Sequence, residues 1–185
     1  MVVECKTEEV PFESAESLHV PGSPGSVFVA LRPDNTTVDV RLLAEGLMEE
    51  ADKVGAEGWT KTKHTQRVIP IERIAPENEI DTLARKIVDV HFPPLPVAER
   101  KDPLATFRIQ YEEHSAALHL HKLDVEKTIA DMVPSDSYKV DLQKADFTIL
   151  CIVAGGSVMM SVVKGYDDKL HHFHIHSQPP SVSSA

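Results

Sequence analysis

The sequence predicts an α/β (α+β) fold arranged as two units, and three observations support this prediction. A short apolar run at residues 147–153 precedes Gly155-Gly156 and a second β-prone run at 157–164, which is typical of a buried strand, a tight turn and an antiparallel partner. Apolar residues recur every three or four positions at 38–54 and 77–92, which indicates amphipathic helices. Strand and helix patterns alternate through 106–153, as in a strand–helix–strand unit.

The first unit is expected to follow a mobile lead-in. Residues 1–25 are acidic and then punctuated by Pro and Gly, which is typical of a segment without fixed structure. Residues 26–32 predict a strand, and the amphipathic helix at 38–54 follows a turn. Residues 68–71 predict a further strand, in which Pro70 favours an edge position or a bulge.

The second unit is expected to add helices and strands in alternation. The helix at 77–92 has Glu residues in its first turn and ends at a Pro-Pro pair. Residues 106–111 alternate apolar and polar side chains, which predicts a half-buried strand. A helix at 124–133 then leads to the strand at 147–153, which should run parallel to 106–111. Residues 177–185 are rich in Pro and Ser, and we expect them to be disordered.

Composition limits the classes of function. The formal net charge is −10, which argues against a simple nucleic-acid binder. Residues 1–57 carry a net charge of −8 and the rest of the chain −2, so the acidic load is mostly N-terminal. No apolar run approaches the length of a membrane span, and the first residues lack the layout of a secretory signal. Two cysteines, Cys5 and Cys151, suit a reduced intracellular protein.

Catalytic and metal-binding motifs are weak. The serines after Gly155-Gly156 lack the Gly-x-Ser-x-Gly elbow, and no phosphate-binding loop follows the glycines. His172, His174 and His176 alternate and would project to one side of a strand, which leaves open a small metal-dependent enzyme. No acidic residue or cysteine follows at ligand spacing, and we expect no metal site, no cofactor and no catalytic residue.

A basic stretch is the strongest functional signal in the sequence. Lys61, Lys63, Arg67 and Arg73 are concentrated in a chain that is otherwise acidic, and such side chains along a strand can contact phosphates. Arg67 is the first candidate of this group. A second group of candidate RNA-binding residues consists of Arg108, Lys139 and Lys164.

Four segments resemble, in order and in spacing, the THUMP-domain tRNA acetylation adaptors. The segments are Gln66-Arg67-Val68-Ile69-Pro70-Ile71, Thr106-Phe107-Arg108-Ile109, Lys139-Val140-Asp141-Leu142 and Ser161-Val162-Val163-Lys164-Gly165-Tyr166. The resemblance implies an N-terminal ferredoxin-like unit at 26–75 and a THUMP domain with a mixed, partly parallel sheet at 76–176.

The resemblance also implies a function and partners. Proteins of this family are non-catalytic, bind tRNA and assist an RNA cytidine acetyltransferase that forms N(4)-acetylcytidine. A nuclear, nucleolar or cytoplasmic location, with no membrane association, would follow. Two alternatives stay open: a THUMP RNA-binding subunit that serves tRNA thiolation or methylation, and a small metalloenzyme that uses the C-terminal histidines.

Overall fold

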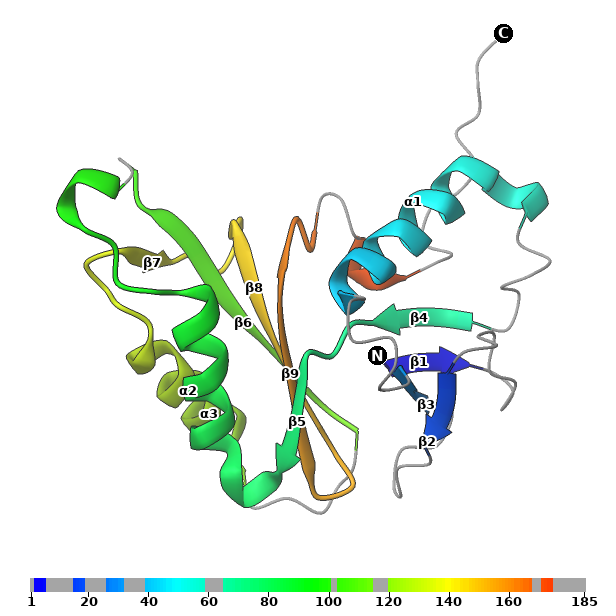
Figure 1. Ribbon diagram of the computed structural model, residues 1–185, viewed down its shortest axis with the longest axis horizontal. Helices are drawn as coiled ribbons and strands as arrows, with labels where there is room; N and C mark the ends of the chain where they lie inside the picture. Colours follow the sequence, from blue (N-terminus) through cyan, green and yellow to red (C-terminus); the bar gives the residue numbers. More distant parts are fainter. Residues whose placement is uncertain are drawn as a thin grey trace, which may run out of the picture. The chain divides into compact units, whose positions relative to one another are not determined.

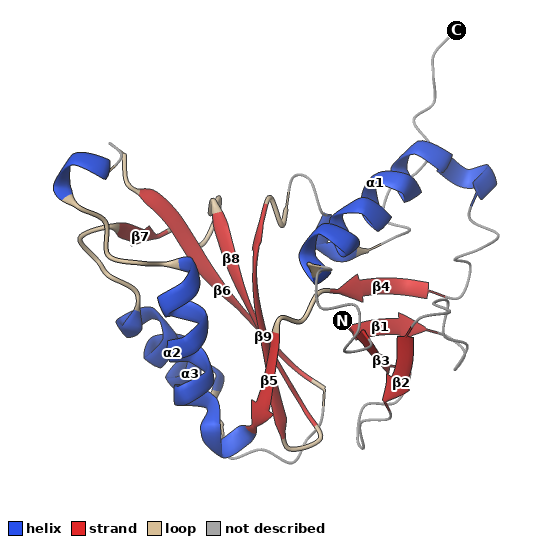
Figure 2. Ribbon diagram, in the orientation of Figure 1, coloured by secondary structure: helices blue, strands red, loops and turns tan. Residues whose placement is uncertain are grey.

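The computed structural model describes residues 2–5, 15–18, 26–31, 39–58, 65–100, 103–114, 120–167 and 171–174. The chain forms two compact units and passes from the first to the second between Pro70 and Ile71, returning between Tyr166 and Asp167. Strands β1–β4 and helix α1 belong to the first unit, and β5–β9 with α2 and α3 belong to the second (Figures 1 and 2).

The first unit contains a four-stranded sheet in the order β2-β3-β1-β4, in which all neighbours are antiparallel. The predicted strand at 26–32 is confirmed, whereas the strand predicted at 68–71 lies earlier, at Thr65–Ile69, as an edge strand that ends before Pro70. The ferredoxin-like character of this unit stays a prediction. The strand bounds are Val2–Cys5 for β1, Ala15–Leu18 for β2, Ser26–Leu31 for β3 and Thr65–Ile69 for β4.

Strands β1 and β2 lie within the segment that the sequence predicts to be a mobile lead-in. β1 is an inner strand, since Val2 pairs with Phe28 of β3 on one side and with Ile69 of β4 on the other. The expectation for residues 1–25 is therefore corrected at these two strands. Strands of four residues have little periodicity of their own, and they form here by pairing with distant parts of the chain.

Helix α1 (Val40–Gly58) confirms the predicted helix in this unit. Asp39 stands before its first turn, where Oδ1 accepts the backbone N–H of Arg41 at 2.9 Å, and this is how an N-cap residue satisfies an unpaired helix donor. The helix predicted at 38–54 continues beyond residue 54, through Gly55, to Gly58. A glycine inside a helix lowers the stability of the helix by only about 1 kcal/mol relative to alanine, so a helix can continue through it.

The second unit contains a five-stranded mixed sheet in the order β5-β9-β8-β6-β7. β6 runs parallel to β7 and β8, and the remaining pairs are antiparallel. Helices α2 and α3 cover one face of this sheet (Figure 1), and their buried side chains form a core with it. The predicted helices and the parallel pairing of 106–111 with 147–153 are confirmed. The bounds are Arg73–Pro76 (β5), Ile80–His91 (α2), Ala105–Glu113 (β6), Lys122–Met132 (α3), Tyr138–Val140 (β7), Phe147–Ala154 (β8) and Ser157–Lys164 (β9), with 3-10 helices at Glu77–Glu79 (η2) and Val97–Glu99 (η3).

The β8–β9 hairpin is formed as predicted. Gly155 and Gly156 have φ values of 56° and 78°, which is the positive φ that a tight hairpin turn requires and glycine readily adopts. Residues 148–154 of β8 are all buried, so this strand is covered on both faces, as its unbroken apolar run predicts.

Strand β5 is a feature that the sequence pattern does not reveal. It pairs with β9 at the edge of the sheet, and Glu72 anchors its start by donating its backbone N–H to the Met160 carbonyl at 3.1 Å and accepting the Val162 N–H on Oε1 at 2.8 Å. Glu72 Oε2 also lies 2.7 Å from His91 Nε2 at the end of α2. These long-range contacts, rather than local periodicity, define the strand.

Candidate nucleic-acid interface

A groove of about 1060 Å³ lies at one end of the five-stranded sheet in the second unit. At this end β6, β7 and β8 begin and β9 ends, because Phe147 at the start of β8 pairs with Lys164 at the end of β9. The lining consists of Pro103, Leu104, Ala105, Thr106, Lys139, Val140, Asp141, Lys144, Asp146, Phe147 and Lys164.

An aromatic cluster beneath this end of the sheet holds the strands that form the groove. The Phe92 ring, 1% exposed at the end of α2, lies 5.1 Å from the Tyr138 ring, 5.5 Å from the Phe147 ring and 5.6 Å from the Phe107 ring, centroid to centroid. Tilted and edge-to-face arrangements at such separations are favourable. The Phe92 side chain therefore packs against the first residues of β7 and β8 and against the third residue of β6.

Three lysines from separate segments line this groove, and we call it the lysine groove. Lys139 lies on the edge strand β7, Lys144 in the turn before β8, and Lys164 at the end of β9. All three side chains are exposed. Lys164 Nζ lies 5.0 Å from the centroid of the Phe147 ring, a cation–π contact that holds the ammonium group at the groove wall.

The two aspartates of the lysine groove are engaged with the backbone. Asp141 Oδ1 accepts the backbone N–H groups of Gln143 at 2.8 Å and Lys144 at 3.0 Å, and these bonds hold the pKa of Asp141 below its usual value. Asp146 Oδ2 accepts the backbone N–H of Thr106 at 2.8 Å and its hydroxyl at 3.0 Å. The carboxylates thus shape the turn that presents Lys144, and the groove keeps a net charge of +1.

The predicted RNA-binding residues are only partly brought together. Lys139 and Lys164 line the lysine groove, whereas Arg73 lies on β5 at the opposite edge of the sheet. Lys61 and Lys63 lie outside the described residues. Lys144 is not among the residues predicted from the sequence, and the signal that indicates it is the Asp141-x-x-Lys144 turn directly after a lysine-bearing strand.

Arg67 and Arg108 are engaged inside the structure. Arg67 is 7% exposed, and its Nε donates to the His172 carbonyl at 2.9 Å. Arg108 Nε donates to Thr148 Oγ1 at 3.3 Å, and its guanidinium carbon lies 5.3 Å from the Tyr166 ring centroid. Both guanidinium groups therefore contribute to packing, and their predicted contact with phosphate stays a prediction.

The C-terminal histidines do not form the strand that their alternation suggests. Residues His171–Phe173 form a 3-10 turn (η4) in the first unit, with φ values of 57° at His172 and 61° at Phe173, and His174 pairs with Arg67 in an isolated bridge. His176 lies outside the described residues. Among the residues that the structure describes, no three His, Cys, Asp or Glu side chains are grouped as metal ligands require.

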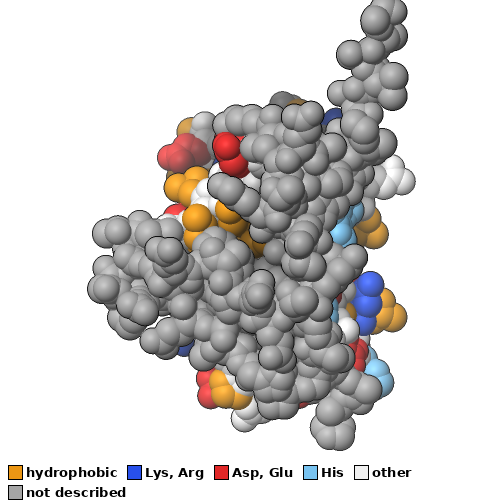
Figure 3. Space-filling model, turned by 90° about the vertical axis from the view of Figure 1, so that its right-hand side faces the viewer, with side chains coloured by type: hydrophobic (Ala, Val, Ile, Leu, Met, Phe, Trp, Pro, Cys, Tyr) orange, Lys and Arg blue, Asp and Glu red, His pale blue; other side chains and the backbone are white. Residues whose placement is uncertain are grey.

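Exposed cations also lie on the helices of the second unit, namely Arg85 and Lys86 on α2 and Lys127 on α3. On the face shown in Figure 3, the described hydrophobic, acidic, basic and histidine side chains appear in small groups of mixed type. None of the described helices combines the length and the apolar character that crossing a bilayer requires.

Residues 75–163 match the family model of the THUMP domain. The second unit of the chain therefore contains a THUMP domain, an RNA-binding module of tRNA-modification enzymes. The predicted fold class, a mixed α/β chain with a partly parallel sheet and a THUMP domain, is confirmed. The assignment to the tRNA acetylation adaptors stays a prediction.

Solved structures with a similar fold include PH1313 from Pyrococcus horikoshii, with a TM-score of 0.54 and 12% identity over 89% of this chain. That alignment covers 55% of PH1313, so the chain spans about half the length of this similar protein. The THUMP domain of THUMP domain-containing protein 1 matches with 21% identity and a TM-score of 0.38, over 48% of this chain and 84% of that one. A 4-thiouridine synthetase–RNA complex with bound ATP matches with 10% identity and a TM-score of 0.49, over 89% and 41%. No curated protein matches the sequence.

Proposed function

We propose that this chain is a non-catalytic adaptor that binds tRNA through the lysine groove and presents it to an RNA cytidine acetyltransferase. The observation that carries the proposal is the convergence of Lys139, Lys144 and Lys164 on one groove of a THUMP domain. The acetyltransferase partner and the product, N(4)-acetylcytidine, come from the sequence resemblance. A nuclear, nucleolar or cytoplasmic location is part of the same proposal.

The chemistry of the lysine groove suits the RNA backbone. Lysine is a compact cation that attracts a phosphate oxygen without requiring a fixed geometry. The Phe147 ring, the one aromatic side chain that lines the groove, already lies against Lys164 Nζ. Contacts of this kind position an RNA without reading its bases, so we expect the groove to bind RNA with little sequence preference and other determinants to select the tRNA.

The test of RNA binding is titration of unmodified tRNA with the protein at several salt concentrations. We expect at least tenfold weaker binding of tRNA by the Lys139→Ala/Lys144→Ala/Lys164→Ala variant. The plot of log K against log salt has a negative slope, and the magnitude of that slope should decrease by about 2–3. Each phosphate contact that is lost removes about 0.7–0.9 of a released counterion. Thermal unfolding should be unchanged, since all three side chains are exposed.

The matched control removes the same charge from the helical face. The Arg85→Ala/Lys86→Ala/Lys127→Ala variant loses three exposed cations on α2 and α3, and it should retain most of its affinity. Equal weakening in the two variants would mean that only the net charge matters and that the lysine groove is not the RNA site.

The adaptor role requires a separate measurement. Incubation with unmodified tRNA, acetyl-CoA and ATP should form acetylcytidine only when the acetyltransferase is added, and the groove variant should lower the yield. Acetylcytidine formed by this chain alone would refute the non-catalytic role. Loss of a thiolated or methylated nucleoside, instead of acetylcytidine, from the tRNA of a deletion strain would assign the chain to another tRNA modification.

A further inference from the structure

A second groove lies between the first turns of α2 and α3, at the opposite end of the second unit's sheet from the lysine groove. α2 follows β5, whose last residue Pro76 pairs with Ser157 at the start of β9, and α3 follows the end of β6. Both helices therefore begin at the end of the sheet where β9 starts. The lysine groove lies at the end where β9 stops.

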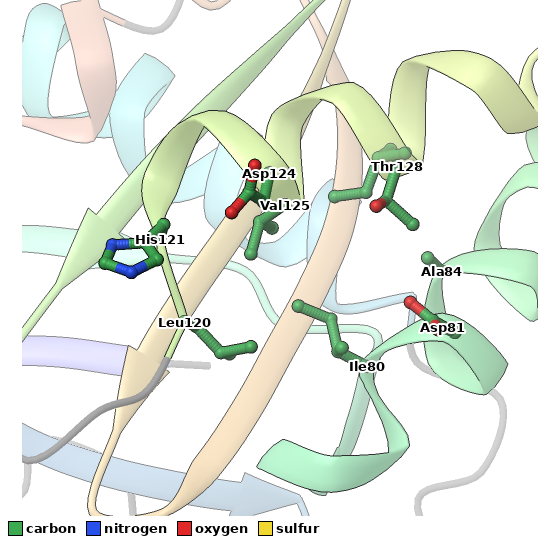
Figure 4. Close-up of a pocket in the computed structure, with 9 residues that line it drawn as sticks. Ile80, Asp81, Ala84, Leu120, His121, Asp124, Val125 and Thr128 are labelled. Carbon is green, nitrogen blue, oxygen red and sulfur yellow. The ribbon is translucent and has the colours of Figure 1, made fainter.

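This second groove has an apolar floor and an acidic rim, and we call it the acidic groove. Its volume is about 260 Å³. Ile80 from α2 and Leu120 from the segment before α3 extend into the space between the helices (Figure 4). Val125 and Ala84, 5% and 1% exposed, belong both to the lining and to the buried core. The acidic groove is thus a continuation of the hydrophobic core to the surface.

The charge of the acidic groove is negative. Asp81 and Asp124 both line it and are exposed, and neither carboxylate makes a hydrogen bond or an ion pair within the described part of the chain. Among the described residues that line it, there is no Lys or Arg. First-turn aspartates also stabilise their helices through the macrodipole, but here both lie beside an exposed apolar floor.

We propose that the acidic groove binds a segment of a protein partner in which Lys or Arg residues flank an apolar side chain. An apolar side chain, or the aliphatic stem of the basic residue itself, would cover the floor, while its cation would lie beside Asp81 and Asp124. The groove is smaller than most pockets for small molecules, which are about 300–1,000 Å³, and its size suits one or two side chains of a peptide. Phosphates are repelled by the same carboxylates, so the acidic groove is not a second RNA site.

This inference goes beyond the proposed tRNA-binding function and does not depend on it. The two sites lie at opposite ends of the sheet and have opposite charge. The domain would therefore hold RNA at one end and a basic protein segment at the other. Variants of one site should leave binding at the other unchanged.

The test uses the full chain and a fluorescein-labelled peptide with the core Arg-Leu-Arg-Leu-Arg, followed by fluorescence anisotropy. The peptide should bind saturably, and a Glu-Leu-Glu-Leu-Glu peptide should not. The Asp81→Asn/Asp124→Asn variant should weaken binding of the basic peptide at least fivefold. The matched control, Asp89→Asn/Asp131→Asn, removes two exposed carboxylates from the same helices outside the groove and should leave the affinity unchanged.

Three outcomes would overturn the inference: no saturable binding of the basic peptide, equal weakening in the control variant, or loss of tRNA binding in the Asp81→Asn/Asp124→Asn variant. The last result would assign the groove to nucleic acid. Thermal unfolding of each variant establishes that it is folded. A charge swap provides a second check, because Asp124→Lys should weaken the basic peptide and strengthen the acidic one.

Discussion

At the scale of single residues, the positions of Arg67 and Lys144 differ from what the charge pattern of the sequence predicts. Arg67 lies in the most basic stretch, yet it is buried, and its Nε donates to the His172 carbonyl. Lys144 has no basic neighbour in the sequence, yet the turn that Asp141 closes presents it at the lysine groove. Burial and a short hydrogen-bonded turn, neither of which composition reveals, determine where these two side chains lie.

The turn at Asp141 leads to a prediction at this scale. Asp141 repels phosphate by its charge but orders the turn through Oδ1. Asp141→Asn keeps an acceptor at this position and removes the charge, so tRNA should bind about two- to fivefold more tightly. Asp141→Ala also removes the acceptor, and it should bind tRNA less tightly than the asparagine variant. Titration of tRNA with both variants measures the two effects, and equal affinities would show that the Oδ1 hydrogen bonds do not position Lys144.

At the scale of elements, pairing partners matter more than the intrinsic preference of a segment. β8 and β9 form a hairpin from neighbouring residues, whereas β1 is formed from the start of the chain and lies between β3 and β4. An inner strand satisfies the backbone groups of both neighbours. Removing it leaves two strand edges without partners.

Truncation of residues 1–24 should therefore destabilise the first unit. We expect its thermal midpoint to fall by at least several degrees, because the loss of β1 and β2 leaves β3 unpaired on both edges and removes the strand that pairs with β4. Differential scanning calorimetry of the full and truncated chains measures the change. The second unit provides the internal control, since the elements that form its sheet begin at β5. An unchanged midpoint for the first unit would mean that β1 contributes nothing to its stability.

At the scale of the whole molecule, the core of the second unit carries ionisable groups that must stay neutral. Cys151 is fully buried on β8, and burial raises the pKa of its thiol from 9.0 to about 12. Desolvation likewise raises the pKa of the Tyr111 hydroxyl to about 12, and this buried hydroxyl has no hydrogen-bond partner within the described part of the chain. Both groups ionise more easily in the unfolded chain than in the folded one.

Stability should consequently fall at alkaline pH. Below about pH 9 the Cys151 thiol stays protonated in the folded and in the unfolded chain. As the pH rises from 9 toward 12, the thiol loses its proton only in the unfolded chain. The free energy of unfolding should then decrease by at most about 1.4 kcal/mol per pH unit for this group. Urea unfolding at pH 8, 9, 10 and 11 measures the slope. Cys151→Ala lowers stability at every pH through the cavity it creates, but its slope between pH 9 and 10 should be shallower. Identical slopes would show that the Cys151 thiol does not cause the loss of stability at alkaline pH.

The sequence by itself determined the elements whose signals are local. The Gly155-Gly156 turn, the buried run of β8 and the apolar stripe of α2 depend on backbone φ values and side-chain periodicity within a few residues. Only the tertiary structure decided which short strands pair and which lysine side chains line the same groove, because both depend on residues far apart in the chain. Lys139, Lys144 and Lys164 come together because the sheet places β7 and the end of β9 at the same groove. Arg67 is withdrawn from solvent for the same reason, through its contact with a residue 105 positions away.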